Sequence, residues 1–131
     1  MTVNLIFPGQ PITKKNSQQI MVNKRTGAPM VFPSKAYRDY ERRIKASLGI
    51  EDLPQFTGPV NMRCLYHLKD NRRPDLLNLL AATSDILEAL GVVVNDRQVE
   101  AVDGSRIAGV SPHNPRVEIT LTRLDTGGLF E

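Results

Sequence analysis

Apolar and polar residues alternate along this chain with two different periods, and the change of period predicts its elements. A period of two, typical of strands, is clearest over residues 60–68, where every second side chain from Val60 to Leu68 is apolar. Shorter runs of the same kind predict further strands at residues 3–7, 98–107 and 117–121. Apolar residues 20–22 and 29–32 flank a turn-forming segment and indicate a β-hairpin.

Two other segments repeat apolar residues every three or four positions, which is the period of an α-helix. The first follows Ser34, a favourable N-cap residue, and ends at Gly49. The second begins at Pro74 and ends before Gly91, and its leucine-rich stripe is expected to face the core. The order of elements is β, β-hairpin, α, β, α, β, β.

This order predicts one α/β (α+β) domain with a mixed β-sheet and two main helices. We expect the domain to cover residues 1–124 and a flexible tail to cover residues 125–131. The single cysteine, Cys64, excludes an intrachain disulfide and a cysteine-rich zinc site, and favours a reducing, cytoplasmic compartment. No apolar run approaches the roughly 18 residues of a membrane span, so we expect no membrane partner.

Charge is distributed unevenly along the chain. Residues 1–73 carry 13 Lys and Arg against 5 Asp and Glu, a net charge of +8, whereas residues 74–131 carry 4 against 9, a net charge of −5. One interpretation is an uneven but ordinary solvated surface. The other is a basic surface for nucleic acid beside an acidic cluster that holds a metal ion.

The second helix carries the candidate chemistry. A helical wheel places two carboxylates and an amide on one edge beside the apolar stripe: Asp75, Asp85 and Asn78. The small side chains of Ala81 and Ala82 flank this edge. Small residues leave room for a phosphate backbone or an ion. Alternatively, Asp75 is an acid favoured by the helix dipole in the first turn, and Asp85 is an ordinary exposed acid. Leu77 lies opposite the stripe, either as an ordinary exposed leucine or as a dimer contact.

Two further acids follow this helix. Asp96 lies in a turn and is expected to fold back toward the start of the helix or its flank, and Asp103 lies in a strand-like stretch. Together with Asp75 they would supply oxygen ligands of the kind that suit Mg²⁺. Cations directly before the helix would hold a phosphate backbone, as metal-assisted phosphodiester cleavage requires: Lys69, Arg72 and Arg73.

These residues resemble the RusA family of Holliday junction resolvases. The family pattern is a basic run, then Asp-x-Asp-Asn-Leu opening a helix, then an Asp-Asp pair before a strand. Residues 72–79, 85–87 and 95–99 carry this pattern, residues 11–17 and 34–37 also resemble the family, and the resemblance extends over about residues 3–123.

The resemblance can be carried over residue by residue. Asp75 matches the first aspartate of the motif and Asn78 matches its asparagine. Asp96 matches the second aspartate of the later pair, where Asn95 replaces the first, and Asp85 matches an aspartate within the helix of the family.

Two positions depart from the pattern. Leu77 stands where a second catalytic aspartate is usual, and Ala81 stands where a functional lysine is usual. Asp103 or Asp85 is then the candidate for the missing carboxylate. Two functions follow: a resolvase that cleaves, or a junction-binding protein of the same family whose cleavage is impaired or lost.

The resemblance implies a homodimeric crossover junction endodeoxyribonuclease of phage or prophage type, acting in DNA recombination and repair. It would use Mg²⁺ to resolve four-way DNA junctions by paired symmetric nicks in phosphodiester bonds. The expected catalytic residues are Asp75, Asn78, Asp96 and Asp103, and the expected metal ligands are Asp75, Asp85, Asp96 and Asp103. The expected DNA contacts are Lys14, Lys15, Asn16, Lys35, Arg38, Lys69, Arg72 and Arg73.

Overall fold

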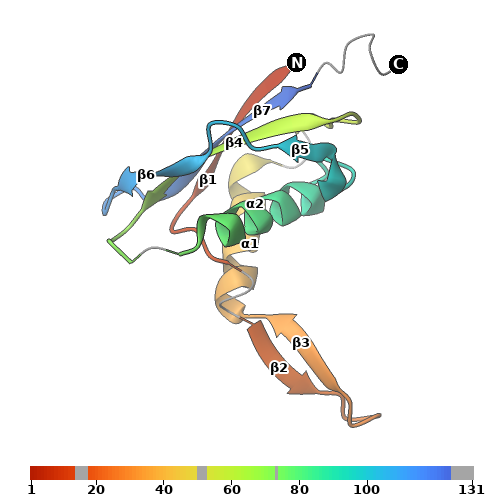
Figure 1. The fold of residues 1–131 in the computed structure, drawn as a ribbon. Coiled ribbons are helices and arrows are strands. Elements are labelled where there is room, and N and C mark those ends of the chain that lie inside the picture. Colours follow the sequence, from red (N-terminus) through yellow and green to blue (C-terminus); the bar gives the residue numbers. More distant parts are fainter. Residues whose placement is uncertain (14–17, 50–52, 73, 125–131) are drawn as a thin grey trace.

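Five strands form one mixed sheet in the computed structural model, which describes residues 1–13, 18–49, 53–72 and 74–124 (Figure 1). β1 (Thr2–Pro8) pairs antiparallel with β7 (Arg116–Arg123), and β7 pairs antiparallel with β4 (Val60–Leu68). Along its other edge β4 pairs in parallel with β5 (Val99–Ala101) and β6 (Arg106–Val110). The predicted mixed sheet is therefore confirmed.

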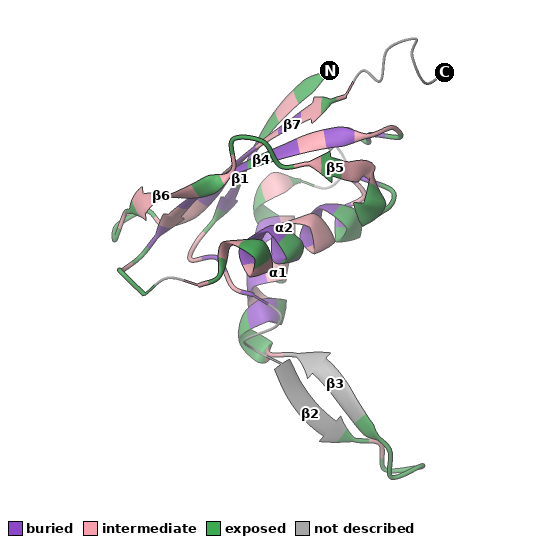
Figure 2. Cartoon of the chain, in the orientation of Figure 1, coloured by how far each residue is buried: buried purple, intermediate pink, exposed green. Residues whose placement is uncertain are grey.

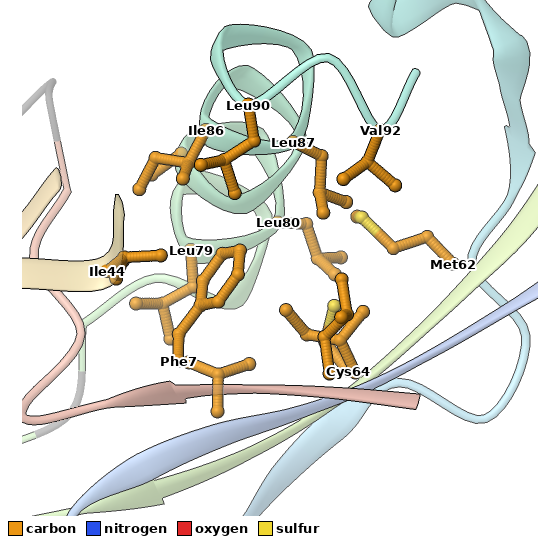
Figure 3. Packing of buried hydrophobic residues seen from close by; sticks show 14 of the residues in the cluster. Phe7, Ile44, Met62, Cys64, Leu79, Leu80, Ile86, Leu87, Leu90 and Val92 are labelled. Carbon is orange, nitrogen blue, oxygen red and sulfur yellow. The ribbon is translucent and has the colours of Figure 1, made fainter. Parts of the chain in front are cut away.

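Two helices cover one face of this sheet: α1 (Lys35–Leu48) and α2 (Leu76–Ala89) (Figure 1). The alternating side chains of β4 that face the helices are buried, because one face of the strand meets the core and the other does not. Figure 3 shows side chains from β1, α1, β4 and α2 converging in this core, among them Phe7, Ile44, Cys64 and Leu79.

The helix boundaries agree with their sequence signals. The Ser34 hydroxyl accepts a hydrogen bond from the Tyr37 N–H at 3.1 Å and caps α1, which ends at Gly49 in the left-handed conformation with φ of 64°. α2 begins at Leu76, two residues later than predicted from Pro74, because the Asp75 side chain is its N-cap. Its predicted core stripe is buried apart from the partly buried Leu76.

The predicted strand over residues 98–107 is divided into β5 and β6, which is a correction. A turn at residues 102–105 separates them, with Gly104 at φ of 85°. The Ser105 hydroxyl accepts a hydrogen bond from the Cys64 N–H at 2.9 Å and donates one to the Met62 carbonyl at 3.0 Å. Between β5 and β6, the Ser105 hydroxyl thus makes the hydrogen bonds to β4 that the backbone of a neighbouring strand would otherwise make.

The predicted hairpin forms a separate two-stranded sheet, made of β2 (Gln18–Val22) and β3 (Pro29–Pro33). It projects away from the sheet and helices beyond the start of α1 (Figure 1), and the turn between its strands is exposed (Figure 2). The expected tail at residues 125–131 lies outside the described residues.

Candidate metal and DNA-binding site

Asp75 lies at the amino end of α2 and is exposed. Its Oδ1 accepts a hydrogen bond from the Leu77 N–H at 2.8 Å, so the carboxylate is oriented by the first turn of the helix. Capping uses one of the two carboxylate oxygens. Capping and metal binding are therefore compatible in this residue.

Asp96 lies at the opposite end of α2, in the short 3₁₀-helix η2 (Asp96–Gln98). Its backbone N–H donates to Glu88 Oε1 at 3.1 Å, and Glu88 is the penultimate residue of α2. Of the two places expected for Asp96, the start of the helix or its flank, the start is therefore wrong, since Asp96 lies against the last turn of α2. Asp75 and Glu88 lie at opposite ends of α2 (Figure 1). At about 1.5 Å of rise per residue, they are about 20 Å apart along the helix axis.

The turn that presents Asp96 is held by the side chain of Gln98, a residue that the motif comparison did not single out. Its carboxamide oxygen accepts hydrogen bonds from the N–H groups of Val94 at 2.7 Å and Asn95 at 3.0 Å. Its amide nitrogen donates to the carbonyl oxygens of Phe56 at 2.8 Å and Gly58 at 2.9 Å. The backbone that carries the Asp96 carboxylate is thus fixed to the body of the protein.

Asp103 is held on the other side of the sheet. Its N–H donates to Asn61 Oδ1 at 2.8 Å, and Asn61 Nδ2 donates to the Asp103 carbonyl at 3.3 Å. Asn61 lies between the buried residues Val60 and Met62 of β4, so it belongs to the face opposite the helices. The turn that carries Asp103 is therefore anchored away from α2.

The remaining residues of the predicted acidic edge have different surroundings. Asp85 is half-buried and its charge, after burial and Glu41, contributes to raising the pKa of Tyr37 in α1, so it lies near that helix. Ala82 is 4% exposed and packs in the core, so the expectation that it leaves room for a ligand is wrong. Asn78 is half-buried in the first turn of α2.

Within the described parts of one protomer, no group of three or more His, Cys, Asp or Glu side chains could hold a metal ion. Each predicted ligand has its own place: one at either end of α2, one near α1 and one beside the open face of the sheet. A single protomer does not gather the four acids at one point.

The predicted DNA contacts of α1 are exposed at its first turn. The Lys35 Nζ lies 3.9 Å from an Asp39 carboxylate oxygen, in a solvent-exposed pair, and Arg38 is exposed beside it. Such pairs are weak and leave the lysine available to a phosphate. Lys14, Lys15 and Asn16 lie outside the described residues.

The segment before α2 presents the other predicted cations. The Lys69 N–H donates to Gln10 Oε1 at 2.7 Å, while its side chain is exposed. The Arg72 backbone and guanidinium both donate to Asp70, at 3.0 and 3.1 Å, and these bonds lower the pKa of that carboxyl. Arg73 is outside the part of the chain that the structure describes.

None of the helices in the described residues is long and apolar enough to cross a membrane.

Comparison with known proteins identifies the family. No curated protein matches the chain in sequence. A family model described as "Endodeoxyribonuclease RusA" matches residues 8–122, which span both helices, the hairpin and every strand of the sheet except β1. The match covers 115 of the 131 residues (122 − 8 + 1), so the chain belongs to the RusA endodeoxyribonuclease family, a family of nucleases.

Proposed function

We propose that this protein is a Mg²⁺-dependent nuclease that binds four-way DNA junctions as a homodimer and nicks two strands symmetrically. The observation that supports it best is the position of Asp75 and Asp96. Both carboxylates are exposed, both are carried on backbones fixed by hydrogen bonds, and they lie at opposite ends of one helix.

The separation of these acids favours a site shared with a second protomer. Direct ligands of Mg²⁺ lie at about 2.0–2.1 Å from the ion. Asp75 begins α2 and Asp96 lies beyond its last turn, so the two carboxylates of one protomer are too far apart to share one ion. An antiparallel contact between α2 and its copy, related by a two-fold axis, brings Asp75 of one protomer to Asp96 of the other. The same axis creates a second, identical site.

The exposed surface of α2 and its flanks supports such a contact. Leu77 is 72% exposed near the start of the helix, and Val94 is 60% exposed just beyond its end. In an antiparallel pair of α2 helices, Leu77 of one protomer would cover Val94 of the other. The small, exposed side chain of Ala81, which lies between these two positions in the chain, permits a close approach of the helices. This favours the dimer contact over an ordinary exposed leucine at residue 77.

The chemistry expected at each site divides between metal and protein. Bound Mg²⁺ would polarise the scissile phosphate and lower the pKa of an attacking water. Asp75 and Asp96 would hold the ion through anionic oxygens, and Asn78, one turn after Asp75, is the residue that would hydrogen-bond the phosphate. The exposed cations Lys35, Arg38, Lys69 and Arg72 would neutralise the DNA backbone.

A second candidate function is junction binding without cleavage. The departures at Leu77 and Ala81 favour it, because neither Asp85, near α1, nor Asp103, held at the open face, lies beside Asp75 in the same protomer. Both functions belong to DNA recombination and repair, in a phage or prophage setting. We place both in the cytoplasm, in keeping with the single buried thiol of Cys64.

A mobile four-way junction with labelled strands tests the proposal. With Mg²⁺ we expect paired nicks at symmetric positions, and with EDTA none. Asp75→Asn and Asp96→Asn are each expected to abolish nicking and to leave junction binding intact or tighter, because each removes a negative charge that would face phosphate.

Asp103→Asn makes the same charge change at a position that is anchored on the other side of the sheet. Wild-type nicking by this variant would exclude Asp103 from the site, whereas loss of nicking would assign it the third carboxylate. Tight binding without Mg²⁺-dependent nicking by the wild-type protein would select the second candidate. Nicking by the Asp75→Asn variant at the wild-type rate would contradict the assignment of Asp75 to the metal site.

A further inference from the structure

The β2–β3 hairpin is not used by the proposed catalytic site. It makes its own two-stranded sheet, with Gln18 opposite Pro33 and Val22 opposite Pro29, and it extends beyond the amino end of α1 (Figure 1). Five residues at about 3.4 Å each give the arm a reach of about 17 Å before its turn. An isolated two-stranded hairpin is only marginally stable in water, so a projecting arm gains from a binding partner.

The tip of this arm is an ordered turn. The Asn23 N–H donates to the Ala28 carbonyl at 2.9 Å, and the Gly27 N–H donates to the Asn23 carbonyl at 2.7 Å. The Asn23 side chain accepts a further bond from the Arg25 N–H at 2.9 Å, and Gly27 has a φ of 71°, which suits glycine. Lys24 and Arg25 are therefore presented on a defined backbone rather than on a loose loop.

The charge of the arm points to an anionic partner. Lys24 and Arg25 are both exposed, and neither forms an ion pair within the described residues. No acidic residue precedes Asp39, whereas the first 38 residues contain six Lys and Arg. Lys35 and Arg38 continue the exposed positive charge at the base of the arm, in the first turn of α1.

We propose that the hairpin tip is a second DNA contact, in which Lys24 and Arg25 hold the phosphate backbone of one duplex arm of the junction at a distance from the point of cleavage. The proposal rests on the proposed function, since it assumes that this protein binds branched DNA. A two-stranded β-ribbon fits the major groove of B-DNA, and cations at its tip reach the phosphates that border the groove. Contacts to phosphate position the protein without reading the sequence.

This geometry determines what the contact does. At about 3.4 Å per base pair, an arm of about 17 Å reaches about 5 base pairs along the duplex. The hairpin therefore lengthens the DNA segment held by each protomer. It favours substrates whose duplex arms extend at least that far from the branch point.

A double variant, Lys24→Gln with Arg25→Gln, tests the proposal in the full-length protein. The matched control is Arg106→Gln with Arg123→Gln, which removes the same charge from two exposed arginines of the sheet. Hydroxyl-radical footprints on a four-way junction in EDTA, and junction affinity over a range of salt concentrations, are the two readouts. Sedimentation of each protein without DNA reports its oligomeric state.

We expect the hairpin variant to lose the protection farthest from the branch point and to keep the protection near it. Losing two phosphate contacts should lower the slope of log affinity against log salt by about 1.8, and affinity at moderate salt should fall about tenfold or more. The control should keep the full footprint and the wild-type slope.

Three results would overturn the proposal. If the wild type binds junctions and the hairpin variant gives the same footprint and slope, the hairpin inference fails and the proposed function stands. If the hairpin variant loses self-association and not DNA protection, the arm joins two copies of the chain instead. If the wild type binds no junction, both the hairpin contact and the proposed function fail.

Discussion

Glu118 illustrates how single residues organise the open face of the sheet. Its Oε1 lies 3.1 Å from His67 Nε2, and its Oε2 accepts a hydrogen bond from Arg116 Nε at 3.3 Å. Burial alone would raise the pKa of this carboxyl, but the bonds from His67 and Arg116 outweigh it and hold the pKa below its ordinary value of 4.5. A carboxyl of this kind stabilises the folded state only while it is ionised.

The sign of the pH dependence follows directly. The stabilisation from Glu118 is fully present above pH 4.5 and is lost as the pH falls through the lower pKa of the folded state. We expect Glu118→Gln to lower the free energy of unfolding at pH 7 by about 1 kcal/mol or less, because the group is partly exposed to screening solvent. Below the folded-state pKa the difference should vanish.

Urea unfolding at pH 7 and at a series of pH values below 4.5 measures this effect. Glu100→Gln, at an exposed position of β5, removes the same charge without the bonds to His67 and Arg116 and should leave stability unchanged throughout. A Glu118→Gln protein that is as stable as the wild type at pH 7 would show that the cluster contributes nothing.

At the scale of the element, Asp75 combines two roles that substitutions can separate. Asparagine is as good an N-cap as aspartate, so Asp75→Asn should keep the bond to the Leu77 N–H while losing the charge. Asp75→Ala loses both and should lower the free energy of unfolding by about 1 kcal/mol. Both variants are expected to lose nicking.

Thermal unfolding and the junction assay, run on the same preparations, check this separation. Ser34→Ala, which removes the cap of α1, is the matched control for a lost cap away from the proposed acids. It should lower stability by a similar amount and retain nicking. Equal stability of Asp75→Ala and wild type would contradict the capping role.

Elements with one buried face could be predicted from the sequence. The alternation over residues 60–68 and the caps of both helices are local signals, and the structure places β4, α1 and α2 within two residues of the expected bounds. Cys64 lies on the buried face of β4, and burial raises its thiol pKa to about 12.

Features that depend on distant hydrogen bonds could not be predicted. The division of residues 98–107 depends on Ser105 bonding to β4, about 40 positions earlier in the chain. The direction of the turn at Asp96 depends on Gln98 reaching the carbonyls of Phe56 and Gly58. A helical wheel shows which acids share an edge of α2, but it does not show that Asp96, which follows the helix, stays at its carboxyl end.

At the scale of the whole molecule, the length of α2 controls how a site can be built. Because α2 separates Asp75 from Asp96, the two acids would hold one ion together only in the proposed symmetric dimer. In that dimer two sites would form together, one at each end of the helix pair. Paired cuts across a junction would follow from this arrangement without any signal between separate active sites.

Mixing two inactive variants distinguishes a site shared between protomers from a site within one. In a heterodimer of Asp75→Asn with Asp96→Asn, a shared arrangement combines both substitutions in one site and leaves the other with two intact aspartates. We therefore expect the mixture to recover nicking although each variant alone has none. Random exchange makes about half of the dimers mixed, so about a quarter of the sites should be active and the products should be single nicks rather than paired ones. If each site used the two aspartates of its own protomer, every site in the mixture would carry one substitution and the mixture would remain inactive.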